Sequence, residues 1–219
     1  MNNTPQNTPR LAPETLRKVE LLRNNLPLFA RTCLKIVTTS GKLEPFIFNE
    51  SQIRLHEAAE AQKRETGMVR LVVPKGRKQG VSTYVGARFF HKVIFNSNMT
   101  VFILSHTSTS TTTLFRMIAK FYKNLPEPLK LKLTVDNTKA MGFENDSLYT
   151  VGTAGEGEIG RGDTPQLFHA SEAASYDNTD ALETGIFQAV ADVEGTEIFI
   201  ESTAKGIGNM FHRYTLNAL

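Results

Sequence analysis

The sequence has a single cysteine, no tryptophan and no long apolar run. The lone Cys33 cannot form an internal disulfide, which argues against a disulfide-stabilised secreted domain and favours a reducing compartment. No segment approaches the roughly 20 consecutive apolar residues that a membrane span needs, and no signal-peptide core opens the chain. Charge is not strongly of one sign, since the formal net charge is +3. We therefore expect a cytosolic protein that is compatible with a nucleic-acid partner without requiring one.

The length of 219 residues suits one domain that buries a substantial core. Residues 1–13 are rich in Asn, Thr and Pro and predict a disordered lead-in, so the folded domain is expected over 14–219. Apolar spacing predicts a helix over 14–25 that covers the core and ends near Pro27. A second helix is expected after an N-cap at Asn49 or Ser51, ending near Gly67.

Further along, apolar runs of strand length alternate with helical periodicity. Strands are expected over 100–105, in short pieces over 129–151, and in the runs 165–172 and 196–202, with a helix over 110–124. Continuous apolar strands are typical of a sheet that is buried on both faces. The alternation predicts an α/β fold with a mainly parallel central sheet flanked by helices.

The most informative stretch is 71–83, LVVPKGRKQGVST, in which an apolar strand meets a basic loop and then a helix. This is the layout of a phosphate-binding loop, because backbone N–H groups at a helix N-terminus, a nearby cation and a hydroxyl on Mg²⁺ together hold a triphosphate. Gly80 permits close backbone approach, and Ser82 can supply the hydroxyl. The candidate loop residues are Lys75, Gly76, Arg77, Lys78, Gln79, Gly80, Val81, Ser82 and Thr83.

The loop departs from the G-x-x-x-x-G-K-[ST] pattern at two places. With Gly80 as the second glycine, the first glycine position holds Lys75 and the lysine position holds Val81. On these residues alone, a basic strand-to-helix loop without a nucleotide remains an alternative. The residues Lys75, Arg77, Gly80, Ser82 and Thr83 nevertheless resemble the deviant Walker A motif of phage large terminase subunits. The resemblance implies that Lys75 or Arg77 replaces the missing lysine, and leaves open which.

The run 165–172, PQLFHASE, ends in Ser171 and Glu172, where a Walker B strand carries Asp and Glu. A glutamate at a strand end can simply be a helix N-terminal charge. His169, Ser171, Glu172 and Ala174, however, resemble the H-x-S-E-x-A form found in terminases. This implies Glu172 as the general base and Ser171 as a weak, neutral Mg²⁺ ligand beside Ser82.

Three more features of the site are implied by the same resemblance. Gln52 resembles the glutamine that reads the adenine edge, although an isolated glutamine on a helix is ordinarily just solvated. Arg161, in the glycine-rich stretch 153–164, resembles an arginine finger acting on a neighbouring subunit, and a solvated loop is the simpler reading. The stretch 202–211 resembles the coupling motif S-T-A-x-G-x-G-N-x-F, with Ser202, Thr203 and Ala204 as coupling residues. A plain strand-to-helix turn would explain its glycines but not Ser-Thr-Ala together with Asn209.

Together these matches resemble the ATPase domain of a phage large terminase, which implies a RecA-like P-loop NTPase fold and the cofactors ATP and Mg²⁺. They imply a motor that moves double-stranded DNA into a procapsid in the host cytoplasm. The implied partners are DNA, further copies in a ring, the portal protein and the small terminase subunit, with no membrane. The family's C-terminal nuclease is expected to be absent, and with it nuclease activity. Another RecA-like motor such as a helicase, or a hydrolysis-deficient nucleotide- or DNA-binding scaffold, remains an alternative.

Overall fold

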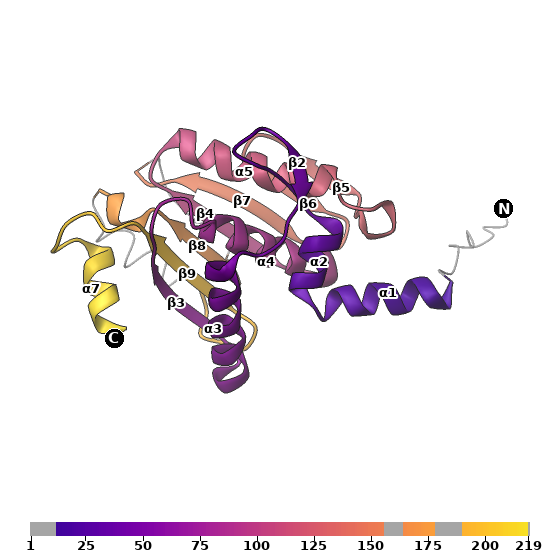
Figure 1. The fold of residues 1–219 in the computed structure, drawn as a ribbon, viewed down its shortest axis with the longest axis horizontal. Coiled ribbons are helices and arrows are strands. Elements are labelled where there is room, and N and C mark those ends of the chain that lie inside the picture. Colours follow the sequence, from indigo (N-terminus) through magenta and orange to yellow (C-terminus); the bar gives the residue numbers. More distant parts are fainter. Residues whose placement is uncertain (1–11, 156–163, 178–189, 219) are drawn as a thin grey trace.

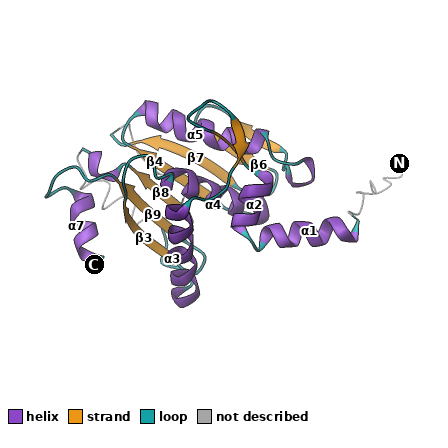
Figure 2. Ribbon diagram, viewed as in Figure 1, coloured by secondary structure: helices purple, strands orange, loops and turns teal. Residues whose placement is uncertain are grey.

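The computed structural model describes residues 12–155, 164–177 and 190–218. A central sheet runs through the molecule, with helices packed against both of its faces (Figure 1, Figure 2). Within the described residues the sheet has seven strands in the order β3-β9-β8-β4-β7-β6-β5. The strands are β3 (Val69–Pro74), β4 (Thr100–Ser105), β5 (Leu133–Asp136), β6 (Ala140–Phe143), β7 (Leu148–Thr153), β8 (Leu167–Ser171) and β9 (Glu197–Ser202). A separate hairpin pairs β1 (Lys35–Val37) with β2 (Leu43–Pro45).

The strands from β3 to β7 in that order pair in parallel, whereas β6 and β5 are antiparallel. Alternate residues of one strand enter different cores, as expected from the period of two. In β4, Val101 and Ile103 join the larger core, and Leu104 joins the smaller core on the other face. The α/β fold with a mainly parallel sheet is therefore as predicted, and the apolar runs were apolar because both faces are covered.

The helices on the larger core include α3 (Glu50–Thr66), α4 (Val81–Phe95) and α5 (Ser108–Lys123). α3 begins after Asn49 in a capping box and ends at Gly67, which has φ +74°, as predicted. α4 is buried along most of its length. The smaller core is covered by α7 (Met210–Asn217) and the short 3₁₀ helix η2 (Ala173–Ser175). In the part of the chain that the structure describes, no helix is long and apolar enough to cross a membrane.

The amino-terminal region differs from the prediction. α1 (Pro13–Arg23) projects from the body and has no fully buried residue, and only Val19 and Leu22 pack, partly buried, against the larger core (Figure 1). Its predicted role of covering the core is therefore met only in part. Most of the cover at this end comes from α2 (Leu26–Cys33), a helix that the sequence analysis missed. Asn25 caps α2, and Pro27 lies in its first turn, where a missing N–H costs nothing. The predicted lead-in 1–13 falls mostly outside the described residues, and Pro13 already belongs to α1.

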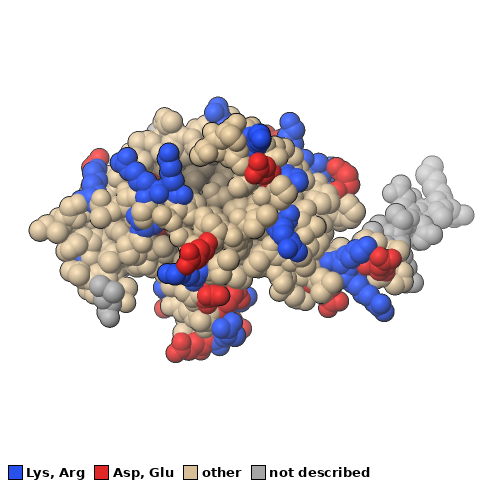
Figure 3. Space-filling model, viewed as in Figure 1, with Lys and Arg blue, Asp and Glu red and all other residues tan. Residues whose placement is uncertain are grey.

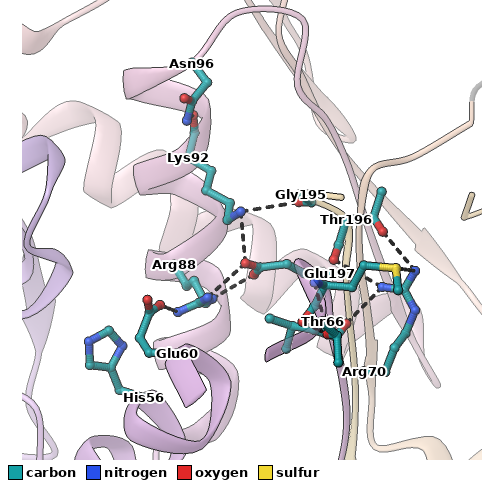
Figure 4. Close-up of polar contacts among 12 residues, drawn as sticks. His56, Glu60, Thr66, Arg70, Arg88, Lys92, Asn96, Gly195, Thr196 and Glu197 are labelled. Carbon is teal, nitrogen blue, oxygen red and sulfur yellow. Dashed lines mark hydrogen bonds and ion pairs between the residues drawn. The ribbon is translucent and has the colours of Figure 1, made fainter. Parts of the chain in front are cut away.

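A buried ion-pair network ties three elements together near the amino end of β9 (Figure 4). Arg88 of α4 donates from Nε to Glu197 Oε2 at 2.7 Å and from Nη2 to Glu197 Oε1 at 2.9 Å. Lys92 Nζ lies 2.9 Å from Glu197 Oε1, and Arg88 also pairs with Glu60 of α3. Burial would raise the pKa of Glu197, but Arg88 and Lys92 lower it below its ordinary value. The network fixes α4 against β9, the strand that carries the acidic end of the site described next.

Candidate nucleotide site

The loop between β3 and α4 lies at the carboxyl edge of the parallel strands, where the ends of β8 and β9 meet it. Its backbone is tied to β9, because Lys75 N donates to Ser202 O at 3.0 Å. Lys78 and Gly80 have φ of +62° and +74°, which turns the chain into α4. Gly80 caps α4 without any side-chain cap. The first N–H groups of α4 are therefore not satisfied by a capping side chain, as an anion-binding helix N-terminus requires.

Lys75 points into the site rather than into solvent. Its Nζ lies 2.9 Å from Glu172 Oε1 and 2.7 Å from Glu201 Oε2, and only 10% of the side chain is exposed. Burial would lower the pKa of Lys75, but the two carboxylates raise it above its ordinary value. Lys75 is thus a fixed cation beside the loop. Arg77 and Lys78 are exposed, and Figure 3 shows Lys and Arg side chains gathered over this loop, beside a hollow.

Glu201, at the end of β9, is the site residue that the sequence analysis missed. Its side chain is fully buried and accepts hydrogen bonds at Oε1 from Ser82 Oγ (2.6 Å) and Ser171 Oγ (2.8 Å). His169 Nε2 lies 3.2 Å from the same oxygen. Burial would raise the pKa of Glu201, but His169 and Lys75 lower it to about 2. The one signal in the sequence was a second carboxylate that follows the apolar residues Ile198, Phe199 and Ile200 in TEIFIES.

Glu172 stands directly after β8 with φ +59° and ψ +43°, a left-handed conformation that is unfavourable for a residue with a side chain. It precedes η2 without making a side-chain cap, so it does not serve as a helix N-terminal charge. Its carboxylate meets Lys75 and accepts a 3.5 Å contact from Thr203 Oγ1. The sequence-predicted pair Glu172 and Lys75 is therefore brought together, with a predicted coupling residue alongside.

The other predicted nucleotide contacts hold the loop against α3. Gln52 Oε1 accepts from Asn49 N at 2.9 Å, and Gln52 Nε2 donates to Gly80 O at 2.8 Å. Gln79 Oε1 accepts from Ser51 Oγ at 2.6 Å. Gln52 is buried, not solvated, and a contact with adenine stays a prediction. Gly76 is exposed, Val81 is buried in the larger core, and Thr83 is half-buried in the first turn of α4.

The coupling stretch is divided between the site and the start of α7. Ser202 Oγ is buried, accepts from Ala174 N at 3.1 Å and donates to Thr203 O at 2.9 Å, whereas Ala204 is exposed. Asn209 needs no coupling role, because its side chain caps α7 by accepting from His212 N at 3.0 Å. The strand-to-helix turn therefore does explain Asn209, contrary to expectation. Arg161 lies outside the described residues.

The hydroxyl groups of Ser82 and Ser171 converge on one oxygen of the Glu201 carboxylate, and oxygen ligands of these kinds are those that Mg²⁺ prefers. Among the residues that the structure describes, no group of three or more His, Cys, Asp or Glu could hold a metal ion alone. These residues therefore fit Mg²⁺ that keeps several waters and is also held by substrate phosphates.

A separate cavity of about 700 Å³ lies near Gly195, but Arg88 and Lys92 in its lining are already paired with Glu197.

A strand, a glycine-containing basic loop and a helix at the carboxyl edge of a parallel sheet, facing an acidic strand end, are the arrangement of the P-loop NTPase fold. Solved structures of phage large terminases share this fold. The HK97 large terminase superposes with a TM-score of 0.72 at 16% identity over 90% of this chain, and this chain spans 41% of its length. The ATPase domain of the Thermus phage P74-26 large terminase gives 0.59 at 16% identity, over 77% of this chain and 69% of that domain.

A third structure, a large terminase of a thermophilic bacteriophage in complex with ADP, gives a TM-score of 0.51 at 12% identity and covers 78% of this chain and 43% of that one. No protein-family model and no curated protein matches the sequence. The structure is therefore similar to phage large terminase ATPase domains in its fold, at low sequence identity. This agrees with the resemblance drawn from the sequence motifs.

Proposed function

We propose that this chain is the ATP-hydrolysing motor domain of a phage large terminase. The observation that carries the proposal is Lys75 at the phosphate loop, 2.9 Å from Glu172 and 2.7 Å from Glu201. A cation, two carboxylates and the Ser82 hydroxyl thus converge beside an uncapped helix N-terminus. These are the groups that phosphoryl transfer from ATP to water requires. The fold neighbours and the motif order support the same assignment.

Each residue has a distinct role in the proposed reaction. The N–H groups at the start of α4 and the Lys75 ammonium bind the phosphates of ATP, and Glu172 orients and deprotonates the attacking water. Ser82 would hold Mg²⁺, which would neutralise charge on the transferring phosphoryl group. Lys75 rather than Arg77 takes the place of the missing Walker A lysine in this proposal, because Lys75 already points into the site and Arg77 is exposed.

The proposal extends to the assembly in which the domain works. Arg161 would complete the site of a neighbouring copy in a ring on the portal protein, and Ser202, Thr203 and Ala204 would pass phosphate release on to the DNA grip. The same family assignment implies two further partners, double-stranded DNA and the small terminase subunit, and a location in the host cytoplasm. The Lys and Arg side chains on the face that carries the phosphate loop (Figure 3) could contact the phosphate backbone of DNA.

Phosphate release from Mg·ATP, with and without double-stranded DNA, tests the motor function. Glu172→Gln should still bind ATP and turn over at least ~10²-fold more slowly, because the water loses its base. Unchanged turnover in this variant would remove Glu172 from the mechanism. A calorimetric titration of folded protein with Mg·ATP that shows no saturable binding would refute the nucleotide site as a whole.

Two alternatives give different results in the same assays. A hydrolysis-deficient scaffold binds nucleotide or DNA without releasing phosphate, and the retained Glu172 carboxylate beside Lys75 argues against it. A helicase would separate strands, whereas the proposed motor moves along intact duplex. DNA binding through phosphate contacts should weaken with salt at a log–log slope of about −0.9 per phosphate neutralised. We expect no plasmid cleavage by the purified chain with Mg²⁺ or Mn²⁺.

A further inference from the structure

The strand that should carry the metal-binding Asp carries Ser171 instead, and a carboxylate from the neighbouring strand reaches the same place. β8 and β9 are parallel, and Ser171 lies opposite Glu201 in their register. Ser171 Oγ donates to Glu201 Oε1 at 2.8 Å, so the two side chains occupy one spot at the edge of the sheet. The carboxylate that the motif lacks on β8 is thus present, supplied by β9.

We propose that Glu201 is the carboxylate that holds the divalent cation of the bound nucleotide, directly or through water. This inference rests on the proposed nucleotide site and adds a residue to it. Ser82 Oγ already donates its proton to Glu201 Oε1 at 2.6 Å, which leaves the hydroxyl oxygen lone pairs available to a metal ion. The hydroxyl at the start of α4 and the carboxylate therefore lie side by side before any ligand arrives. Ser171 acts through Glu201, as a positioning residue.

The burial of Glu201 supports a role beyond the fold. A fully buried carboxylate is costly unless it is paired, and here it is shared by Lys75, His169 and two hydroxyls. Lys75 also forms an ion pair with Glu172, so one ammonium group is shared by two carboxylates. Phosphates that draw Lys75 toward themselves would leave Glu201 with excess negative charge. A divalent cation that enters with the nucleotide replaces that lost positive charge.

A purely structural ion pair is the competing explanation, and metal affinity separates the two. The probe is Mn²⁺, detected by its electron paramagnetic resonance signal as it binds the complex with ATPγS. Glu201→Gln should lower Mn²⁺ affinity about 10–100-fold, the range found when a residue supporting a metal site is lost. In EDTA, the same variant should bind ATPγS within roughly 3-fold of the unaltered chain, because Lys75 and the loop N–H groups are intact.

A matched control lies on the same strand. Glu197 is also a fully buried, paired glutamate of β9, but it belongs to the network with Arg88. Glu197→Gln should lower stability and leave the Mn²⁺ affinity unchanged, when measured at a temperature where circular dichroism shows the variant folded. Adding Ser171→Asp to Glu201→Gln returns a carboxylate to this spot from β8 and should recover part of the lost Mn²⁺ affinity.

The outcomes are distinct. If Glu201→Gln binds Mn²⁺ as tightly as the unaltered chain, the inference is overturned but the proposed nucleotide site is not. If the folded variant loses ATPγS binding in EDTA, the inference is also overturned, because Glu201 then acts on the nucleotide site without a metal ion. If Glu201→Gln does not fold, Glu201→Asp keeps the charge and shortens the side chain, and an Mn²⁺ affinity equal to that of the unaltered chain overturns the inference. Absence of ATPγS binding by the unaltered chain, with or without metal, refutes the proposed function and this inference with it.

Discussion

The substitution Glu197→Gln tests how much the buried network near the amino end of β9 contributes to stability. The change is nearly isosteric and removes one negative charge. Arg88, whose side chain is 3% exposed, loses its two-pronged partner at 2.7 and 2.9 Å and keeps only Glu60. Lys92 loses the one carboxylate that pairs with it among the described residues. Two cations are then left partly buried with incomplete compensation.

Breaking a buried ion pair by removing one partner costs about 3–5 kcal/mol. In a domain of this size each kcal/mol shifts the melting temperature by about 2–4 °C, so we expect a decrease of about 6–20 °C. The stabilisation depends on pH as well. The pKa of Glu197 is lowered in the folded chain, so its contribution is present above the unfolded pKa near 4.3 and is lost as pH falls through the folded value.

Thermal unfolding followed by circular dichroism, with urea unfolding as a second measure, gives the comparison. Glu60→Gln is the matched control, because Glu60 binds the same arginine but its side chain is 33% exposed. Glu60→Gln should lower the free energy of unfolding much less than Glu197→Gln, since partly exposed ion pairs are screened by water. A decrease in melting temperature below about 3 °C for Glu197→Gln, or an equal decrease for both variants, would show that the pairing of Arg88 and Lys92 with Glu197 contributes little to stability.

Three further predictions concern the nucleotide site. Lys75→Ala should weaken ATPγS binding by calorimetry roughly 10–150-fold, the effect of one charge-assisted hydrogen bond, and Arg77→Ala by less than about 3-fold; the reverse order would assign the cation to Arg77. Gly80→Ala should destabilise the chain by more than Gly41→Ala, because both have positive φ but only the Cβ at residue 80 would lie 2.5 Å from Gln52 Nε2. Urea unfolding would show equal losses if that contact were unimportant. The folded pKa of Glu201 is about 2, so its stabilising contribution should be complete above about pH 4.5 and decline toward pH 2, and Glu201→Gln should remove this part of the acid dependence.

The sequence was sufficient for those parts of the fold that rest on local patterns. The run 100–105 became β4 without a change of boundary, because a strand covered on both faces is apolar at successive positions, here from Val101 to Leu104. α3 was bounded correctly because Asn49 and Gly67 are local start and stop signals. α2 was missed for a related reason. It has only eight residues and Pro27 in its first turn, so it offers too little periodicity and an apparent stop signal.

The site was only half readable from the sequence. Lys75, Ser82 and Glu172 each lie in a recognisable local motif, and the fold brings them together. Glu201 gives no such signal, because its partners Ser171 and Lys75 are brought to it by the register of three strands. Register is set by the tertiary pairing of strands, which no single stretch of sequence states. The sequence left open whether Lys75 or Arg77 contacts the phosphates, and our proposal of Lys75 rests on the direction of its side chain.

The left-handed backbone of Glu172 has an evolutionary consequence. A side chain in that conformation costs about 1–2 kcal/mol, which glycine would not incur. A laboratory selection for heat resistance alone should therefore favour glycine at this position, even though such clones would lose the carboxylate that we propose activates the water. If glycine is enriched when only heat resistance is selected, and is not enriched when ATP turnover is also required, then thermal stability is lower at this position for the sake of activity.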